Sequence, residues 1–402
     1  MHILIVTGNF WPEELGISKY STDLFRLLKA SGYEVSVLTT MPYYPKWQIF
    51  QNYRKVKSAK FIFEGSSVWR IRQFVPKRAS LIGRLVLEAS ILLNFVMVSR
   101  RLRGNEYDKV VSFTPNLACG LAGLLISRTW RIPLGVIVQD LTGLGTKQSG
   151  ITFGFLVSRI IKRLEITILK NSSSIVAISS TMVDWIKNQG ISSTMINCIP
   201  NYSVEEIPVL DKNESRSKLM LPPDYKYVIY TGNFGNKQNL ENLIQAARLT
   251  FYRSDIRFLL FGNGSEEEKL KRLAESLDNL MFLPPVSAEL YPDLLSCADI
   301  LLVHERSTQT VMSLPSKITA YIQSSRPIVA AVPLEGATAD FVRDVALLVP
   351  AGQPELLSKS IVDLIDNQIL QEQLVNKSQL LLRPMVEGKL GRSKLESWVR
   401  FL

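Results

Sequence analysis

The sequence predicts an α/β protein of two domains, each with a mostly parallel sheet and helices between its strands. The chain has 402 residues, which is more than one hydrophobic core usually serves. Nearly the same six letters occur twice, as IVTGNF at Ile5–Phe10 and IYTGNF at Ile229–Phe234. Each copy ends an apolar run and precedes a helical segment. A strand that turns through glycine into a helix is how α/β sheets build a ligand crevice, so the repeat predicts one such start per domain.

In the first half, apolar runs alternate with helical patterns. Strands are expected at His2–Thr7, Glu34–Thr39, Ser67–Gln73, Lys109–Phe113, Leu134–Gln139 and Ser174–Ile178. The helices between them are expected at Ser18–Lys29, Leu81–Arg103, Leu117–Thr129, Phe153–Lys170 and Ser180–Asn188. After Ile196–Ile199 the alternation stops, and the polar stretch to Pro223 is expected to be a linker and hinge.

The second half repeats the alternation. Strands are expected at Tyr227–Thr231, Arg257–Phe261, Met281–Leu283, Ile300–Val303, Ile328–Ala331 and Ala346–Val349. Helices are expected at Leu240–Phe251, Glu266–Leu277, Ala288–Cys297, Pro315–Gln323, Thr338–Arg343 and within Leu356–Leu382. The predicted division is a first domain at 1–200, a second at 201–385, and a C-terminal helix at 386–402 that returns to the first domain.

Cysteine and histidine are scarce. Cys119, Cys198 and Cys297 are far apart and form no CxxC motif, so they are expected to be reduced and buried. His2 and His304 are too few for a histidine-based zinc site or a Ser-His-Asp triad, and no metal is expected. The chain starts directly with a strand rather than a signal peptide, which predicts a cytoplasmic protein.

Positive charge is concentrated at the start of the chain. The net charge is +11, and residues 1–105 hold 16 Lys and Arg against 6 Asp and Glu. This asymmetry predicts that the first domain attracts an anion, such as a lipid surface or a phosphate-bearing acceptor; a solvated basic face is the alternative. Nucleic acid is not an expected partner, because no aromatic and basic motif of a known reader is present.

The segment at 81–104 is a candidate membrane contact. It is rich in Leu, Val and Ile and is bracketed by Lys77, Arg78 and Arg84 before it and Arg100, Arg101 and Arg103 after it. It is short for a membrane span and contains Glu88 and Asn94, so a crossing helix is disfavoured. A buried domain helix and an in-plane helix on the inner face of the plasma membrane both remain open.

The loop after the first strand, GNFWPEELGISKYS, is not the dinucleotide fingerprint G-x-G-x-x-G. Gly16 would let the backbone approach a ligand, and Ser18 lies near the helix start, where free amides favour an anion. A plain turn is the alternative. Farther along, Asp140 follows an apolar strand and is expected to orient a sugar hydroxyl or stabilise positive charge at a reacting carbon; it could also cap the next turn.

Two segments of the second domain suit a phosphate. In GNFGNKQNLE, Lys237 lies over a glycine-containing turn near the end of a strand, although a solvated lysine is the alternative. In MSLPSKITAYIQSSRP, Pro315 and Ser316 suit a helix start and Lys317 adds positive charge. A diphosphate could bind there, and helix capping alone would also explain the Pro and Ser.

Together these segments resemble the retaining nucleotide-sugar glycosyltransferases of family GT4, which have the GT-B fold of two Rossmann-like domains facing a cleft. The likeness is greater to the branch that acts in colanic-acid-type and other surface polysaccharide synthesis. It spans almost the whole chain in WPEELGISKYSTDLFRLLKASGYEVSVLTTMPYYPKWQ, VIVQDL, VAISSTM, IPNYS, YTGNFGNKQNLENLIQAA, ADILLV, LPSKITAYIQSSRPIVAAV and LLVPAGQPELL. PYYPKWQ and LPSK are the more specific segments.

The resemblance implies a role for each candidate residue. Asp140, beside the donor sugar, and Lys237, on the phosphates, would be the catalytic residues. The donor would also be bound by Gly16, Gly232, Asn233, Ser316, Lys317 and Ile318. The donor would be a nucleoside-diphospho-sugar, with UDP-glucose as the first choice, and the acceptor a saccharide or a lipid-pyrophosphate-linked saccharide. No cofactor and no metal are implied.

The sequence departs from the family pattern at two places. Gln139 stands where many relatives have a histidine before the aspartate, and it cannot take a proton. Met312 and Ala320 stand where many have the glutamates of E-x7-E, and Glu305 lies upstream without matching. These departures leave two alternatives: a binding module that holds a nucleotide sugar without catalysis, and a GT-B sugar-nucleotide 2-epimerase.

Overall fold

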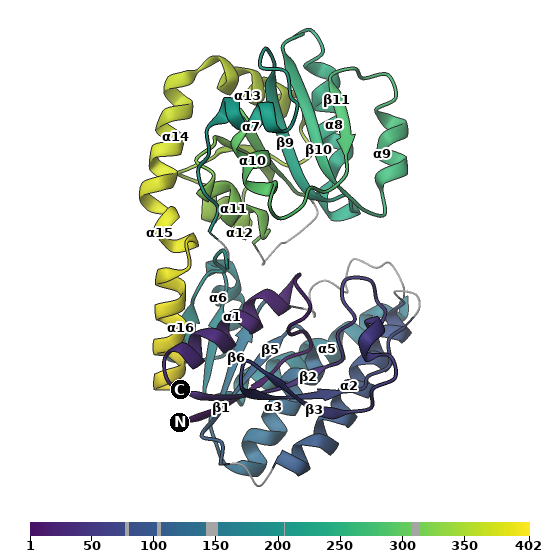
Figure 1. Ribbon diagram of the computed structural model, residues 1–402, viewed down its shortest axis with the longest axis vertical. Helices are drawn as coiled ribbons and strands as arrows, with labels where there is room; N and C mark the ends of the chain where they lie inside the picture. The colour runs from purple at the N-terminus through teal and green to yellow at the C-terminus, as the bar shows by residue number, and fades with distance from the viewer. Residues whose placement is uncertain (77–79, 103–105, 142–151, 205, 308–313) are drawn as a thin grey trace. The chain divides into compact units, whose positions relative to one another are not determined.

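The computed structural model describes the chain except for residues 77–79, 103–105, 142–151, 205 and 308–313 (Figure 1). It divides into two compact units. The first unit comprises Met1–Pro200 and Arg392–Leu402, and the second comprises Asn201–Gly391. Each unit has one sheet with helices packed on it, as the sequence predicts.

The sheet of the first unit has the strand order β3-β4-β2-β1-β5-β6-β7-β8. Its strands are β1 (His2–Val6), β2 (Glu34–Thr40), β3 (Ala59–Phe63), β4 (Ser66–Ile71), β5 (Lys109–Thr114), β6 (Leu134–Val138), β7 (Ser174–Ala177) and β8 (Ile196–Cys198). Its helices are α1 (Ile17–Ala30), η1 (Gln51–Tyr53), α2 (Leu81–Leu102), α3 (Leu117–Trp130), α5 (Thr152–Lys170), α6 (Ser180–Lys187), η3 (Ser193–Met195) and the C-terminal α16 (Lys389–Phe401). Neighbouring strands are parallel except β3 and β4.

The sheet of the second unit is parallel throughout, with the order β11-β10-β9-β12-β13-β14. Its strands are β9 (Lys226–Asn233), β10 (Ile256–Asn263), β11 (Leu280–Leu283), β12 (Ile300–His304), β13 (Ile328–Val332) and β14 (Leu347–Pro350). Its helices are α7 (Lys212–Lys218), η4 (Asn236–Gln238), α8 (Leu240–Leu249), α9 (Glu267–Leu273), α10 (Tyr291–Ser296), α11 (Lys317–Gln323), α12 (Ala337–Val342), α13 (Pro354–Asp366), α14 (Gln368–Leu381) and α15 (Arg383–Val386).

Hydrophobic side chains bury both faces of the second sheet. One cluster includes Tyr230, Phe258 and Leu302, and a second on the opposite face includes Ile229, Leu259 and Leu301. Successive residues of a strand point to opposite faces, so a strand buried on both sides needs an unbroken apolar run. This is why runs such as YVIY and ILLV predict the strands well.

The structure adds two elements that were not expected from the sequence and corrects one expectation. The sequence does not indicate β3, an antiparallel strand at the edge of the first sheet whose residues alternate between half-buried and exposed until the buried Phe63. The expected linker contains a helix, α7, which Asp211 caps by accepting from the amides of Asn213 and Glu214 at 2.9 Å. Cys198 is exposed, whereas Cys119 and Cys297 are buried as expected.

The C-terminal helix α16 packs against the first sheet. The indole Nε1 of Trp398 donates to Ser174 Oγ at 2.8 Å, and its ring lies over Gly135 on β6. A Cβ atom at position 135 would come within 2.6 Å of that ring, so only glycine allows this contact. Arg392 adds an ion pair to Asp23 on α1 at 2.8 Å.

We expect Trp398→Ala to lower the free energy of unfolding by about 3 kcal/mol, because a buried indole leaves a cavity and its hydrogen bond is lost. Trp398→Phe should cost less, since a ring still covers Gly135. Chemical denaturation followed by circular dichroism measures both changes. Equal stability of Trp398→Ala and the unmodified chain would show that α16 contributes nothing to the first unit.

Candidate active site

A glycine-containing loop begins at the carboxyl edge of the second sheet. β9 ends at Gly232 and Asn233, and the chain passes through η4 into α8. Gly232 has φ 133°, a conformation that residues with a side chain rarely adopt. A Cβ atom there would also lie 3.0 Å from Lys317 Nζ. Glycine is therefore required, and it leaves exposed backbone beside an ammonium group.

Lys317 is the first residue of α11 and is half-buried. Its Nζ lies 3.6 Å from the centre of the Tyr230 ring, a cation–π contact. Burial lowers the pKa of Lys317 to about 7, while the negative charge of Glu305 opposes that change. The lysine therefore gains or loses its charge close to neutral pH.

Glu305 follows β12 and is the carboxylate that interacts with Lys317. Its side chain is buried, and Thr338 on α12 donates to its Oε1 at 2.8 Å. Burial raises the pKa of Glu305 to about 7, and the Thr338 hydrogen bond and the charge of Lys317 partly offset this effect. A buried acid after β12 and a half-buried base at the start of α11 thus influence each other's charge.

The end of β12 also holds η4 in place. The ring Nδ1 of His304 lies 2.7 Å from the carbonyl oxygen of Gln238, and its Nε2 lies 3.0 Å from Asn242 Nδ2. Burial lowers the pKa of His304 to about 4, so the ring is neutral at neutral pH. A neutral ring with its proton on Nδ1 satisfies both contacts, donating to Gln238 and accepting from Asn242.

Arg306 completes this support. Its backbone amide donates to the carbonyl of Lys237 at 2.9 Å, and its Nε donates to the carbonyl of Asn236 at 2.7 Å. With His304, the end of β12 therefore engages the carbonyls of all three residues of η4. Lys237 itself is exposed at this turn, so its ammonium is accessible to a ligand.

The start of α11 only partly matches the expectation. Ser316 is exposed, but its side chain makes no capping hydrogen bond. Ile318 is buried in the core, and its amide donates to the Pro315 carbonyl at 3.0 Å, so it is not a free donor. The structure brings Lys317 to Gly232, whereas Ser316 and Ile318 contribute no side-chain contact there.

In the first unit, Gly16 precedes α1 at the carboxyl edge of the sheet, with φ 67°. A side chain would be strained there, so the turn itself requires glycine. The expected approach of a ligand to this backbone stays a prediction. Ser18 donates to the Leu15 carbonyl at 2.8 Å and is buried, so its hydroxyl serves the loop itself.

A buried carboxylate that sequence reasoning missed joins two loops of this edge. Glu13 accepts from the amides of Tyr43 and Tyr44 at 2.7 Å and from Asn9 Nδ2 at 2.9 Å. It thereby ties the PYYPKWQ segment to the loop after β1. Burial raises its pKa, and these three hydrogen bonds act against the increase.

Asp140 lies just after β6 and is exposed. Its Oδ1 accepts from the amide of Leu141 at 2.8 Å, as a turn-capping aspartate would, and its other oxygen is not used in that bond. Gly16 and Asp140 both follow strands of the same sheet at the carboxyl edge. Met312, where a family glutamate was expected, lies outside the described residues.

Glu305, Thr338 and Glu13 contribute to the site but were not expected there. Of these three, only Glu305 could have been proposed from the sequence. It is an acidic residue directly after the apolar run ILLVH, where the end of a buried strand meets the sheet edge. Thr338 and Glu13 act through contacts between segments distant in sequence, which no local pattern shows. Within the described ranges, no group of three or more His, Cys, Asp or Glu residues is arranged to hold a metal ion.

Two family models match the chain. "Glycosyl transferase 4-like domain" matches residues 16–202, and "Glycosyl transferases group 1" matches residues 211–380. WcaI of Escherichia coli K12, named for a glycosyl transferase of colanic acid biosynthesis, is 31% identical over 332 residues, which cover 79% of this chain and 80% of WcaI.

Solved structures share the fold. Sucrose-phosphate synthase of Thermosynechococcus elongatus has a TM-score of 0.76 at 16% identity and covers 100% of this chain and 98% of its own. Anabaena HepE in complex with UDP-glucose has a TM-score of 0.69 at 14% identity, with 100% of both chains covered. These likenesses confirm the expected GT-B fold.

Anion binding at Lys317 should weaken as the pH rises through about 7, because the lysine loses its proton and Glu305 becomes charged over that range. Sulfate is a suitable probe, since its own charge is constant there. The sulfate-dependent rise in melting temperature should fall between about pH 6 and pH 8.5. Lys317→Met should remove this pH-dependent part, and an unchanged pH dependence in that variant would contradict the assignment.

Proposed function

The chain belongs to the GT4 family of glycosyltransferases, and from this we propose that it transfers a hexosyl residue from UDP-glucose, with retention, in surface polysaccharide synthesis. The acceptor would be a saccharide or a lipid-pyrophosphate-linked saccharide. The observation that supports this best is the ammonium of Lys317 beside the exposed backbone of Gly232, at the sheet edge where α/β domains bind ligands.

The choice of donor follows from charge and from relatives. A nucleoside diphosphate carries negative charge that suits Lys317, exposed Lys237 and the main-chain amides of the loop after β9. HepE and a trehalose-6-phosphate protein of E. coli are solved with UDP-glucose and UDP-2-fluoro glucose, respectively. We therefore place the diphosphate between Gly232, Asn233, Lys237 and Ser316, with Lys317 beneath it.

Glu305 adjusts the charge of this site. A donor diphosphate stabilises the protonated form of Lys317, because an opposite charge raises a lysine pKa. Glu305, hydrogen-bonded by Thr338, keeps the lysine close to its titration point when the site is empty. The positive charge is thus present when the leaving group needs it, without an isolated buried cation in the free protein.

The proposed step needs no protein base and no metal. The bond between the anomeric carbon and the diphosphate oxygen breaks, and a bond from that carbon to the acceptor oxygen forms on the same face. The acceptor proton passes to the leaving diphosphate. Asp140 would stabilise positive charge on the sugar, Gly16 would admit the distal phosphate, and Lys237 and Lys317 would stabilise the leaving group.

We also propose that the protein acts in the cytoplasm and contacts an anionic membrane through α2. Ile82, Val86, Leu93 and Met97 recur at helical spacing and are exposed, from 44% for Val86 to 74% for Ile82. The opposite face, with Ile91 and Phe95, is buried in the first unit. We call these four exposed residues the α2 stripe.

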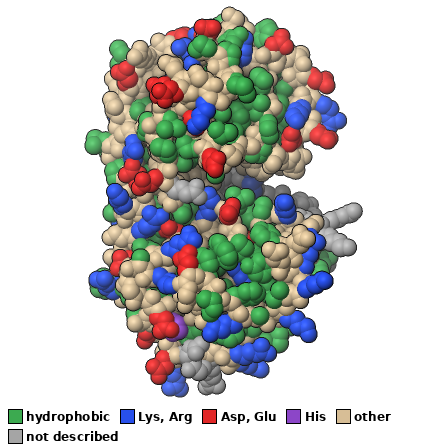
Figure 2. Space-filling view, in the orientation of Figure 1, with side chains coloured by type: hydrophobic (Ala, Val, Ile, Leu, Met, Phe, Trp, Pro, Cys, Tyr) green, Lys and Arg blue, Asp and Glu red, His purple; other side chains and the backbone are tan. Residues whose placement is uncertain are grey.

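Position and charge favour an in-plane contact over a span. α2 is long and apolar enough to cross a membrane by composition alone. Glu88 on α2, however, accepts from Asn116 Nδ2 at 3.1 Å and from the Ala118 amide at 2.8 Å, which ties the helix to α3. Arg84, Arg100 and Arg101 are exposed near its ends, and Lys77, Arg78 and Arg103 lie outside the described residues. In Figure 2, Lys and Arg side chains lie around hydrophobic ones on the visible face of the first unit.

Lys237→Ala should lower turnover with UDP-glucose by about 10²-fold, as expected for the loss of one preorganised group that stabilises a leaving anion. Lys271→Ala, which changes an exposed lysine on α9, is the matched control and should keep full activity. Radiolabelled sugar transfer to a lipid-linked saccharide measures both, and EDTA should not affect either rate. Full turnover in Lys237→Ala would refute its role, and epimerised donor without transfer would favour the 2-epimerase.

Vesicles that contain phosphatidylglycerol should bind the protein, whereas vesicles of phosphatidylcholine alone should bind it weakly. Leu93→Gln with Met97→Gln should weaken binding about tenfold or more, because two apolar side chains no longer enter the bilayer interface. Ile369→Gln with Leu380→Gln, two residues at least as exposed on α14, is the matched control. Co-sedimentation that is identical for all three proteins would exclude the α2 stripe.

A further inference from the structure

A second polar pocket lies at the opposite edge of the second sheet, away from the loop after β9. It is formed where β9, β12 and β13 begin, next to α14, and has a volume of about 400 Å³. The residues that matter for its chemistry are Lys212, Lys226, Asp299, Arg326, Gln368 and Asn376. All of them belong to the second unit. None of them is part of the proposed donor site.

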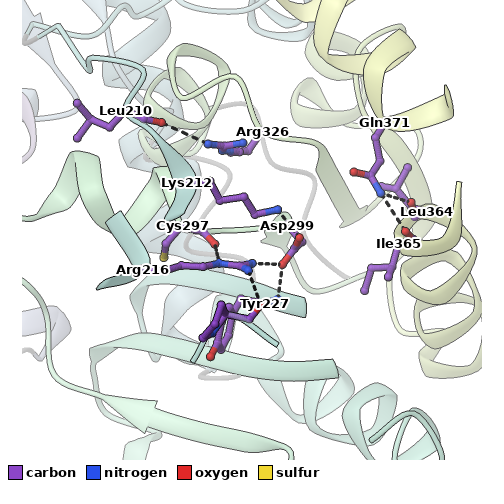
Figure 3. A network of polar contacts seen from close by, with 11 residues as sticks. Leu210, Lys212, Arg216, Tyr227, Cys297, Asp299, Arg326, Leu364, Ile365 and Gln371 are labelled. Atoms are coloured by element: carbon purple, nitrogen blue, oxygen red, sulfur yellow. Dashed lines mark hydrogen bonds and ion pairs between the residues drawn. The ribbon is translucent and has the colours of Figure 1, made fainter. Parts of the chain in front are cut away.

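One carboxylate of this pocket is already fully engaged (Figure 3). Asp299 Oδ2 accepts from Arg216 at 2.6 Å and from the amide of Tyr227 at 2.7 Å, and its Oδ1 accepts from Lys212. Arg216 is itself buried and also donates to the carbonyl of Cys297 at 3.1 Å. Asp299 therefore carries one negative charge between two cations that bond to it directly.

The third cation is Arg326, whose guanidinium makes few hydrogen bonds within the described part of the protein. Its guanidinium lies beside Lys212 in Figure 3 and makes one long hydrogen bond, from Nη2 to the Leu210 carbonyl at 3.4 Å. Its Nε is buried and has no hydrogen-bond partner among the described residues. A buried donor without a partner is costly, and a planar guanidinium is suited to bind an anion with two parallel hydrogen bonds.

The charged groups around Arg326 also favour the binding of an anion. Burial lowers the pKa of Arg326 and that of Lys212. The positive charge of Arg216 adds to both decreases, while the negative charge of Asp299 opposes them. Lys226 is exposed at the pocket and adds another positive charge. Glu372 also lines the pocket, but its Oε1 accepts from Gln368 Nε2 at 2.9 Å. The group as a whole has more positive than negative charge.

We propose that this pocket binds a small phosphate-bearing molecule, with Arg326 and Lys226 on the phosphate and the amides of Gln368 and Asn376 on hydroxyl groups. Its volume exceeds that of a bare phosphate and lies within the range of small-molecule sites. Ile365 and Val375 supply an apolar wall for the remainder of the molecule. A phosphorylated sugar has this combination of charge, hydroxyl groups and size.

The test uses the full chain saturated with UDP, so that phosphate cannot be counted at the proposed donor site. Calorimetric titration with inorganic phosphate and with glucose 6-phosphate should show binding, tighter for the sugar phosphate, whereas glucose should show none. Arg326→Gln should weaken binding about tenfold or more, as expected for the loss of a charge-assisted hydrogen bond. Arg272→Gln, which changes an exposed arginine on α9, is the matched control and should bind like the unmodified chain.

Lys226→Gln keeps the test decisive if Arg326→Gln fails to fold, because Lys226 is exposed and its loss should also weaken binding. Absence of any titration with both phosphates, or equal affinity in the Lys226 and Arg272 variants, would overturn the proposal. Binding of UDP alone is measured first. A chain that binds UDP but neither phosphate refutes only this pocket. If UDP does not bind, the donor site is refuted, and weaker phosphate binding by Lys226→Gln than by Arg272→Gln still assigns the phosphate to this pocket.

Discussion

The candidate site of the second unit depends on contacts between the end of β12 and the turn after β9. His304, Glu305 and Arg306 are consecutive; His304 and Arg306 contact the loop that carries Gly232 and Lys237, and Glu305 interacts with a lysine on α11. His304 and Arg306 engage the carbonyls of η4, while Glu305 interacts with Lys317. The support works because the His304 ring is neutral, so one nitrogen donates and the other accepts.

Local sequence patterns predict the parts of the fold that are buried on both sides. Parallel strands such as β9 and β12 are unbroken apolar runs, and both sheets were expected from them. The helix α7 could not be predicted this way, because KNESRSK is entirely polar. Arg216 is nevertheless buried there, since Asp299 and two carbonyls satisfy its guanidinium. Contacts between distant segments, rather than the local composition, therefore stabilise this helix.

The same distinction applies to the candidate site. Lys237, Lys317, Gly232 and Gly16 could be proposed from glycine-containing turns and helix starts, which are local features. The partner of Lys317 could not, because Glu305 and Thr338 come from two other elements. Sequence also overstated the helix start, since the amide of Ile318 is used by Pro315. Local motifs thus locate charged groups, while packing decides which of them are paired.

The acidic group next to Lys317 does not come from the helix where the family pattern has its second glutamate. Ala320, at the position of the second glutamate of E-x7-E, is buried in α11 among apolar neighbours, so a carboxylate there would need a partner that this core does not supply. Glu305 instead emerges from the end of β12 and receives a hydrogen bond from Thr338. A buried acid at this place interacts with the lysine next to the loop. The acidic group that influences the charge of Lys317 therefore comes from the end of a neighbouring strand rather than from the helix that bears the lysine.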